Sequence, residues 1–165
     1  MNAAYSLFPE YETPPKPESP TRHLSVVRIA LIKERPVIYN GAKLIQPEQA
    51  AEAFRAILPD IDREYFVVFI LDVKNRIVSC NIVSVGSLNQ SIVHPREVFK
   101  AAILANGACI LLAHNHPSGD CTPSSEDIAI TRRLKEAGDV LGIKVLDHII
   151  VGDGCHLSFT ERGLL

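Results

Sequence analysis

The 165-residue sequence lacks the features of a membrane protein and of a small secreted domain. No stretch approaches the about 18 consecutive apolar residues of a transmembrane helix. The first residues, MNAAYSLFPEYE, contain acids and no basic segment ahead of an apolar core, so they do not match a signal peptide. The four cysteines form no CxxC pair, which argues against a disulfide framework and against a cysteine zinc knuckle. We therefore expect a soluble cytoplasmic protein without a membrane segment.

The sequence also contains no tryptophan, no internal repeats and no excess of basic residues. Its 17 Lys and Arg stand against 19 Asp and Glu, so a nucleic-acid partner would depend on a local basic patch. Hydrophobic residues make up 47% and charged residues 22% of the chain, which is typical of a globular protein. This length fits one domain with an extension.

Three regions differ in pattern along the chain. Residues 1–22 contain four prolines between Pro14 and Pro20, which favour a flexible leader because proline lacks a backbone donor. Residues 23–42 form a predicted β extension, because HLSVVRIALIK (23–33) is rich in β-branched residues. Residues 43–165 alternate helical and extended patterns, which predicts a single α/β domain.

The domain is predicted to have a mixed central β-sheet flanked by helices. The run EYFVVFILD is almost entirely apolar and indicates a strand covered on both faces. Proline near helix starts and Gly107 and Gly142 as stops support the helices. Helices are expected at 46–58, 94–107 and 123–142, and strands at 64–72, 77–86, 108–114, 143–152 and 156–160.

The stretch LLAHNHPSGDCTPSSED, residues 111–127, concentrates polar side chains directly after an apolar strand. If the extended conformation continues to residue 116, His114 and His116 point to the same side. The PSG turn lets the chain fold back, and Asp127 lies three residues before the core-facing Ile130 of the next helix. A carboxylate is therefore expected to approach two imidazoles.

Two histidine nitrogens and one carboxylate oxygen suit zinc and leave a fourth tetrahedral position open, as in catalytic zinc sites. A metal-activated water would then act as nucleophile near neutral pH. Such a hydrolase needs an acid/base and a donor to the developing oxyanion. Ser124, one helical turn before Asp127, is the candidate donor.

The pattern H-x-H-P followed by S-x-x-D resembles that of the JAMM (JAB/MPN-plus) zinc metallopeptidases. More narrowly, roughly residues 43–165 resemble the JAB-type domain of the bacterial RadC family. The supporting runs are EYFVVFILDVKNRIVS, VHPREVFKAAILANGACILLAHNHPSGDCTPSSEDIAITRRL and LGIKVLDHIIVGDG with LSFTERGLL. The resemblance implies a JAB/MPN, cytidine-deaminase-like architecture and hydrolysis of a peptide or isopeptide bond in a peptide or protein substrate.

The resemblance also implies residue roles. Zinc would be held by His114, His116 and Asp127, with Ser124 stabilising the tetrahedral intermediate. The family uses a glutamate at the end of the first helix or in the following strand, and Glu64 fits that place better than Glu97, which lies inside the second helix. Since a short leader stands where full-length RadC proteins have a helix-hairpin-helix region, we give the family's DNA-repair label little weight.

Simpler interpretations remain for several of these residues. Asp127 and Ser124 fit a helix capping box, a role compatible with metal binding. The simpler interpretation of Glu64 is an ordinary solvated side chain. Cys121 fits a loop thiol better than a fourth ligand. The pair Asp147 and His148 either tunes the site from outside the ligand shell or ends a strand.

Two other functional interpretations remain open. A metal-binding nucleic-acid module for repair or recombination would use the basic residues that surround the motif, although solvated helices often carry the same residues: Arg96, Lys100, Arg132, Arg133 and Lys135. A catalytically silent scaffold is disfavoured because the ligands are intact. The letters HNH at 114–116 do not indicate an HNH nuclease, whose residues are spread over a longer motif.

Overall fold

The computed structural model describes residues 24–37, 44, 46–58, 62–86 and 93–165. Its sheet has the strand order β2-β1-β3-β4-β5, and β3 and β4 are the parallel pair while the other neighbours are antiparallel. This is the mixed sheet expected from the sequence. The elements are α1 (Pro47–Ile57), β1 (Tyr65–Leu71), β2 (Ile77–Val85), α2 (Pro95–Leu104), β3 (Cys109–Asn115), α3 (Ser125–Leu141), β4 (Lys144–Val151) and β5 (His156–Ser158).

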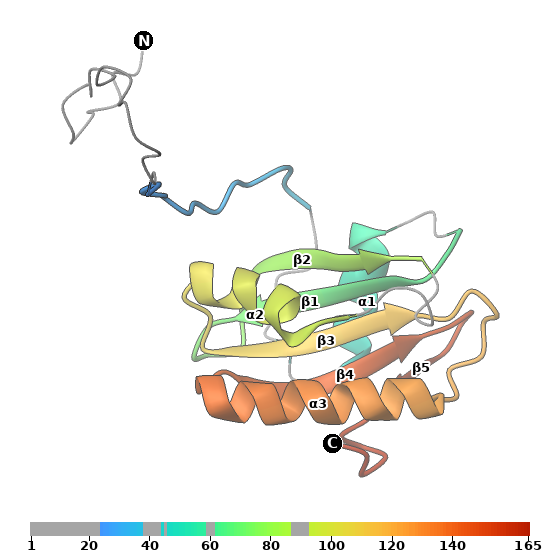
Figure 1. Ribbon diagram of the computed structural model, residues 1–165. Helices are drawn as coiled ribbons and strands as arrows, with labels where there is room; N and C mark the ends of the chain where they lie inside the picture. The colour runs from blue at the N-terminus through green and yellow to red at the C-terminus, as the bar shows by residue number, and fades with distance from the viewer. Residues whose placement is uncertain (1–23, 38–43, 45, 59–61, 87–92) are drawn as a thin grey trace, which may run out of the picture.

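The helices cover both faces of the sheet, with α1 on one face and α2 and α3 on the other (Figure 1). Successive residues of β1 and β3 therefore enter different cores, which explains why both strands are almost continuously apolar. The core on the α1 side includes Val67, Phe69, Leu111 and Phe54 of α1. The core on the α2 and α3 side includes Phe66, Val68, Leu112, Phe99 and Leu134.

The parallel connection from β3 through α3 to β4 brings the carboxyl end of β3 to the amino end of α3. Gly142 ends α3 in the left-handed conformation, as predicted. At the end of α2 the left-handed residue is Asn106, not Gly107. A side chain at position 107 would meet Ile70 Cγ2 at 2.4 Å, so glycine is needed there for close packing.

The strand predicted over 23–33 was wrong for the residues that the structure describes. Residues 24–37 form neither helix nor strand, and they lead away from the sheet (Figure 1). Leu24 and Val26 are 94% and 95% exposed. High β propensity indicates a strand only where a neighbouring strand supplies hydrogen bonds and burial. The predicted leader over residues 1–22 lies outside the described residues.

Among the helices that the structure describes, none combines the length and the apolar character that a membrane span requires.

Cys121 and Cys155 form a disulfide, so the expectation that Cys121 is a loop thiol was wrong. The bond joins the loop after β3 to the turn between β4 and β5. The two cysteines are 34 residues apart, and sequence spacing alone does not predict that their turns meet. Cytoplasmic localisation, which was argued partly from cysteine usage, stays a prediction.

Replacing both Cys121 and Cys155 by serine is expected to lower the free energy of unfolding by about 3–4 kcal/mol, because the closed loop restricts the unfolded chain. Urea denaturation would measure this change. Cys80→Ser is the matched control, because Cys80 is an exposed free thiol. Equal stability of the double variant and the parent under oxidising conditions would contradict a structural role for the bond.

Candidate metal centre

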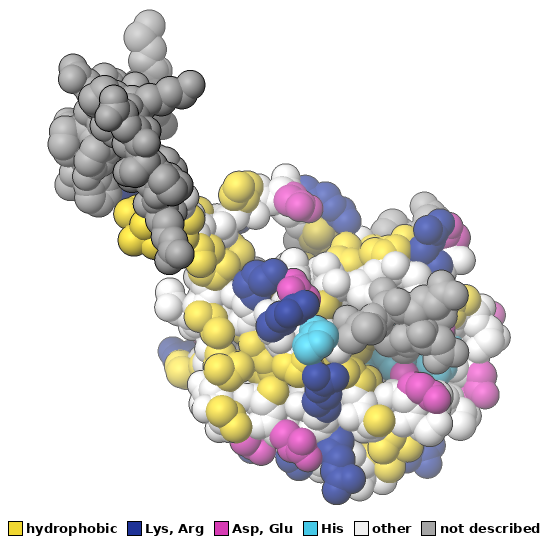
Figure 2. Space-filling model, viewed as in Figure 1, with side chains coloured by type: hydrophobic (Ala, Val, Ile, Leu, Met, Phe, Trp, Pro, Cys, Tyr) yellow, Lys and Arg dark blue, Asp and Glu magenta, His cyan; other side chains and the backbone are white. Residues whose placement is uncertain are grey.

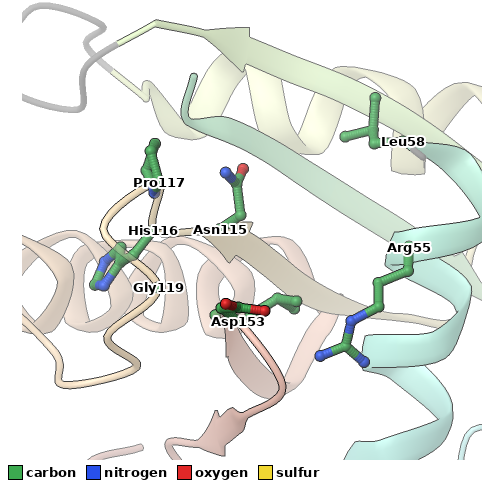
Figure 3. A pocket seen from close by; sticks show the side chains of 9 residues that line it. Arg55, Leu58, Asn115, His116, Pro117, Gly119 and Asp153 are labelled. Carbon is green, nitrogen blue, oxygen red and sulfur yellow. The ribbon is translucent and has the colours of Figure 1, made fainter. Parts of the chain in front are cut away.

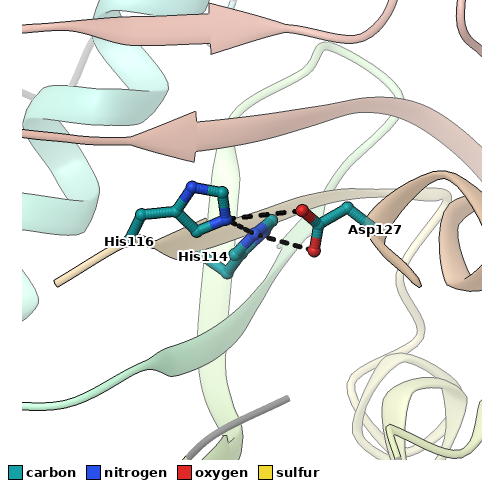
Figure 4. Close-up of side chains that lie close together, drawn as sticks. All are labelled: His114, His116 and Asp127. Carbon is teal, nitrogen blue, oxygen red and sulfur yellow. Dashed lines mark hydrogen bonds and ion pairs between the residues drawn. The ribbon is translucent and has the colours of Figure 1, made fainter. Parts of the chain in front are cut away.

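Three predicted ligands converge at the carboxyl end of β3 (Figure 4). His114 belongs to β3, His116 follows it, and Asp127 lies in the first turn of α3. The Nε2 atoms of the two histidines are 3.0 Å apart. Asp127 Oδ1 lies 3.2 Å from His114 Nε2, and Asp127 Oδ2 lies 3.4 Å from His116 Nε2. One ligand atom from each residue therefore surrounds a common point that can hold a metal ion.

The hydrogen bonds around these side chains fit a metal. His116 Nδ1 lies 2.7 Å from the carbonyl oxygen of Asp120. Because a carbonyl only accepts, Nδ1 carries the proton, and a neutral ring then directs the lone pair of Nε2 toward the centre. Asp127 Oδ1 is buried and has no hydrogen-bond partner among the residues that the structure describes. Such an atom is costly unless it meets a cation.

The Asp127 carboxylate also caps α3. The Ser124 backbone N–H and hydroxyl both donate to Oδ2, at 2.8 and 2.7 Å, and Ser124 Oγ accepts from the Asp127 N–H. Burial raises the pKa of Asp127, but the polar groups around the carboxylate, these Ser124 donors among them, outweigh it and hold the pKa well below its ordinary value. The cap and the anionic ligand are thus one arrangement, with Oδ2 used by Ser124 and Oδ1 free for a metal.

Glu64 and Glu97 occupy different surroundings. Glu64 directly precedes β1, and extending the pairing of Phe66 with His114 by two residues sets Glu64 opposite His116, on the same face of the sheet. Glu97 lies in α2, is partly exposed and pairs with Lys100 at 2.5 Å and Arg96 at 3.5 Å. The sheet register therefore favours Glu64 as the acid/base, which stays a prediction.

Asn115, between the two histidines, is a site residue that the sequence analysis missed. Its Oδ1 accepts from the Tyr65 N–H at 2.8 Å, and its Nδ2 donates to the Arg63 carbonyl at 2.9 Å. These bonds hold the backbone on both sides of Glu64. An asparagine inside a strand gives no such signal in the sequence, because its partners are 50 and 52 residues away.

A hollow of about 350 Å³ adjoins the metal centre (Figure 3). His116 and Asn115 line it, and Arg55 at the end of α1 and Asp153 after β4 flank it. The Arg55 guanidinium donates to the Cys155 carbonyl at 3.1 Å. The His116 side chain is 14% exposed, whereas those of His114 and Asp127 are 0% and 1% exposed, so the His116 side of the centre reaches solvent.

Asp147 and His148 both lie inside β4, so the alternative that this pair ends a strand was wrong. Asp147 accepts from the N–H groups of His148 and Thr160 and from the Ser158 hydroxyl, which ties β4 to the chain after β5. His148 contacts the predicted ligand His114, and its Nε2 lies 2.8 Å from His114 Nδ1. Burial lowers the pKa of His148 well below its ordinary value, which favours the neutral form of this ring.

The comparison with protein families agrees with this geometry. The model of the RadC-like JAB domain matches residues 44–164, which include the three predicted ligands. The chain belongs to the RadC family. The JAB-type fold and family membership expected from the sequence are thereby confirmed.

Relatives of this RadC-like JAB domain are proteins named UPF0758. The relative from Pelobacter propionicus is 61% identical over 126 residues, or 76% of this chain and 55% of its own length. The Geotalea uraniireducens protein is 58% identical over 74% of this chain and 54% of its own length. The Geobacter sulfurreducens protein is 54% identical over 81% of this chain and 58% of its own length. The chain thus spans about half the length of these relatives, and their names state no activity.

Several cationic side chains of the RadC-like domain lie beside acids. Lys and Arg stand among Asp and Glu on the face shown in Figure 2. Arg132 lies 3.8 Å from Glu136, and Lys100 and Arg96 both contact Glu97. These ion pairs reduce the charge that the predicted basic patch would offer to a phosphate backbone.

Proposed function

We propose that this domain is a zinc-dependent hydrolase that cleaves a peptide or isopeptide bond. The observation that carries the proposal is the buried Asp127 Oδ1, which has no hydrogen-bond partner in the described part of the chain. It lies 3.2 Å from His114 Nε2, in a cluster completed by His116. Zinc, when bound, supplies a Lewis acid that activates water and polarises a carbonyl. A set of three protein ligands leaves room for such chemistry.

The protein's part in the reaction is proton transfer and charge stabilisation. Glu64 takes a proton from the attacking water and delivers it to the leaving amine. The Asn115 bonds to the backbone of Arg63 and Tyr65 keep Glu64 on the face that carries His116. Ser124 donates to the developing oxyanion once its hydroxyl turns from Asp127 Oδ2, to which it donates at 2.7 Å.

We place the substrate chain in the hollow between Arg55 and Asp153. His116 lines this hollow and is the ligand whose side chain reaches solvent. A peptide seated there brings its carbonyl to the open side of the metal centre. The polar groups of Arg55 and Asp153 can pair with main-chain amides, and Leu58 and Pro117 offer apolar contact.

Chelator-sensitive peptide cleavage tests this proposal. The full chain, loaded with zinc, is expected to cleave members of a peptide and isopeptide library, to lose cleavage with a chelator, and to regain it with zinc. The His114→Ala variant is the control for contaminating proteases, because it keeps the surface and loses a ligand. Cleavage that is equal in this variant, or absent from the zinc-loaded parent across the library, would count against the proposal.

The alternative function, a metal-binding nucleic-acid module, predicts a different result. It requires DNA binding that weakens steeply with salt and that is lost when Arg132 and Arg133 are replaced. The net charge of −2 and the pairing of Arg132 with Glu136 favour the hydrolase.

A further inference from the structure

A buried chain of hydrogen bonds runs behind the metal centre and returns to it. Thr131 Oγ1 donates to the Asp127 carbonyl at 2.6 Å. The same oxygen lies 2.5 Å from His148 Nδ1, and His148 Nε2 lies 2.8 Å from His114 Nδ1. Thr131, His148 and His114 are all completely buried. The chain therefore connects the backbone of one predicted ligand with the side chain of another.

The proton positions in this chain follow from its fixed end. A carbonyl only accepts, so the single hydroxyl proton of Thr131 points to Asp127. Thr131 Oγ1 must then accept from His148, which places the His148 proton on Nδ1. Complete burial disfavours a charged His148, and a ring with its single proton on Nδ1 accepts at Nε2, so His114 donates from Nδ1. His114 is left with a lone pair on Nε2, the atom that faces Asp127 and His116.

We propose that Thr131 and His148 are positioning residues that set His114 in its metal-binding tautomer before any metal arrives. The inference rests on the proposed function for the identity of the metal, but the tautomer itself is a property of the metal-free chain. Phe159 stacks on His148 with ring centroids 4.8 Å apart, and Phe66 packs against it at 5.4 Å. The His148 ring is thus held in one orientation.

Removal of the Thr131 hydroxyl is expected to reverse the tautomer preference of His148 and His114. Without an acceptor at Nδ1, His148 gains by moving its proton to Nε2, where it donates to His114 Nδ1. His114 then carries its proton on Nε2, the atom that must bind the metal. Zinc binding must then return both protons to Nδ1, so the affinity of the chain for zinc falls.

The test combines nitrogen-15 NMR of the histidine rings with zinc titration of the chelator-treated full chain. In the metal-free parent, His114 and His148 are expected to be protonated on Nδ1. Thr131→Val keeps the shape, and we expect it to shift both protons to Nε2 and to weaken zinc binding by about 10- to 100-fold. Thr131→Ser, which keeps the hydroxyl, is expected to retain the tautomers and the affinity of the parent.

The proposal would be overturned by a parent protein with the His114 proton on Nε2. It would equally be overturned by a Thr131→Val variant with the tautomers and zinc affinity of the parent. Both measurements are made without substrate. If the proposed peptidase function is wrong, the parent shows no cleavage. The tautomers and the zinc affinities decide this inference separately.

Discussion

The Glu64→Gln variant is expected to bind zinc like the parent and to lose catalytic rate by about 10²- to 10⁴-fold, the range attributed to general acid–base catalysis. Glutamine keeps the size of the side chain but cannot accept and return a proton. The register places Glu64 opposite His116, and the Asn115 bonds to Tyr65 and Arg63 maintain that placement. Rates of peptide cleavage, measured beside the zinc content of each sample, would show the loss.

Glu97→Gln is the matched control for this experiment. Glu97 lies in α2 and pairs with Lys100 and Arg96, so its replacement is expected to leave the rate of cleavage unchanged. A Glu64→Gln variant that cleaves as fast as the parent, together with an inactive Glu97→Gln variant, would assign the acid/base role to Glu97.

The Asp127→Asn variant is expected to lose both zinc binding and cleavage. The amide keeps an oxygen for the Ser124 N–H and hydroxyl, but it removes the negative charge that the unpartnered Oδ1 brings to the centre. Loss of a direct ligand should weaken zinc by more than the about 10- to 100-fold typical of a residue behind the ligands. Calorimetric titration with zinc would measure the change.

Asp120→Asn provides the comparison within the same loop. Its side chain binds the Thr122 N–H and hydroxyl, whereas its backbone carbonyl holds His116. We therefore expect Asp120→Asn to bind zinc like the parent. Similar zinc affinity for Asp127→Asn and the parent would remove Asp127 from the ligand set.

The sequence predicted much of this fold because its signals are local. Apolar runs and helical periodicity predicted each strand and helix that the structure describes between residues 46 and 165, with ends displaced by a few residues. The alternation of side chains along an extended chain was enough to bring His114 and His116 together. The turn that follows them, and the cap at Ser124, brought Asp127 into range.

What the sequence did not predict depends on contacts between distant segments. Asn115 binds the backbone at Arg63 and Tyr65 because β1 and β3 are neighbours in the sheet. The contact between His148 and Thr131 needs α3 to pack on β4. The disulfide needs two turns to meet, and the predicted strand over 23–33 failed because no propensity scale supplies a pairing partner.

The metal content of the full chain, purified without added metal, tests the central claim most directly. Elemental mass spectrometry is expected to find about one zinc per chain, removed by a strong chelator and restored by zinc, as for a three-ligand site of this kind. Less than about half an equivalent of zinc that reconstitution does not raise would contradict a zinc centre at His114, His116 and Asp127.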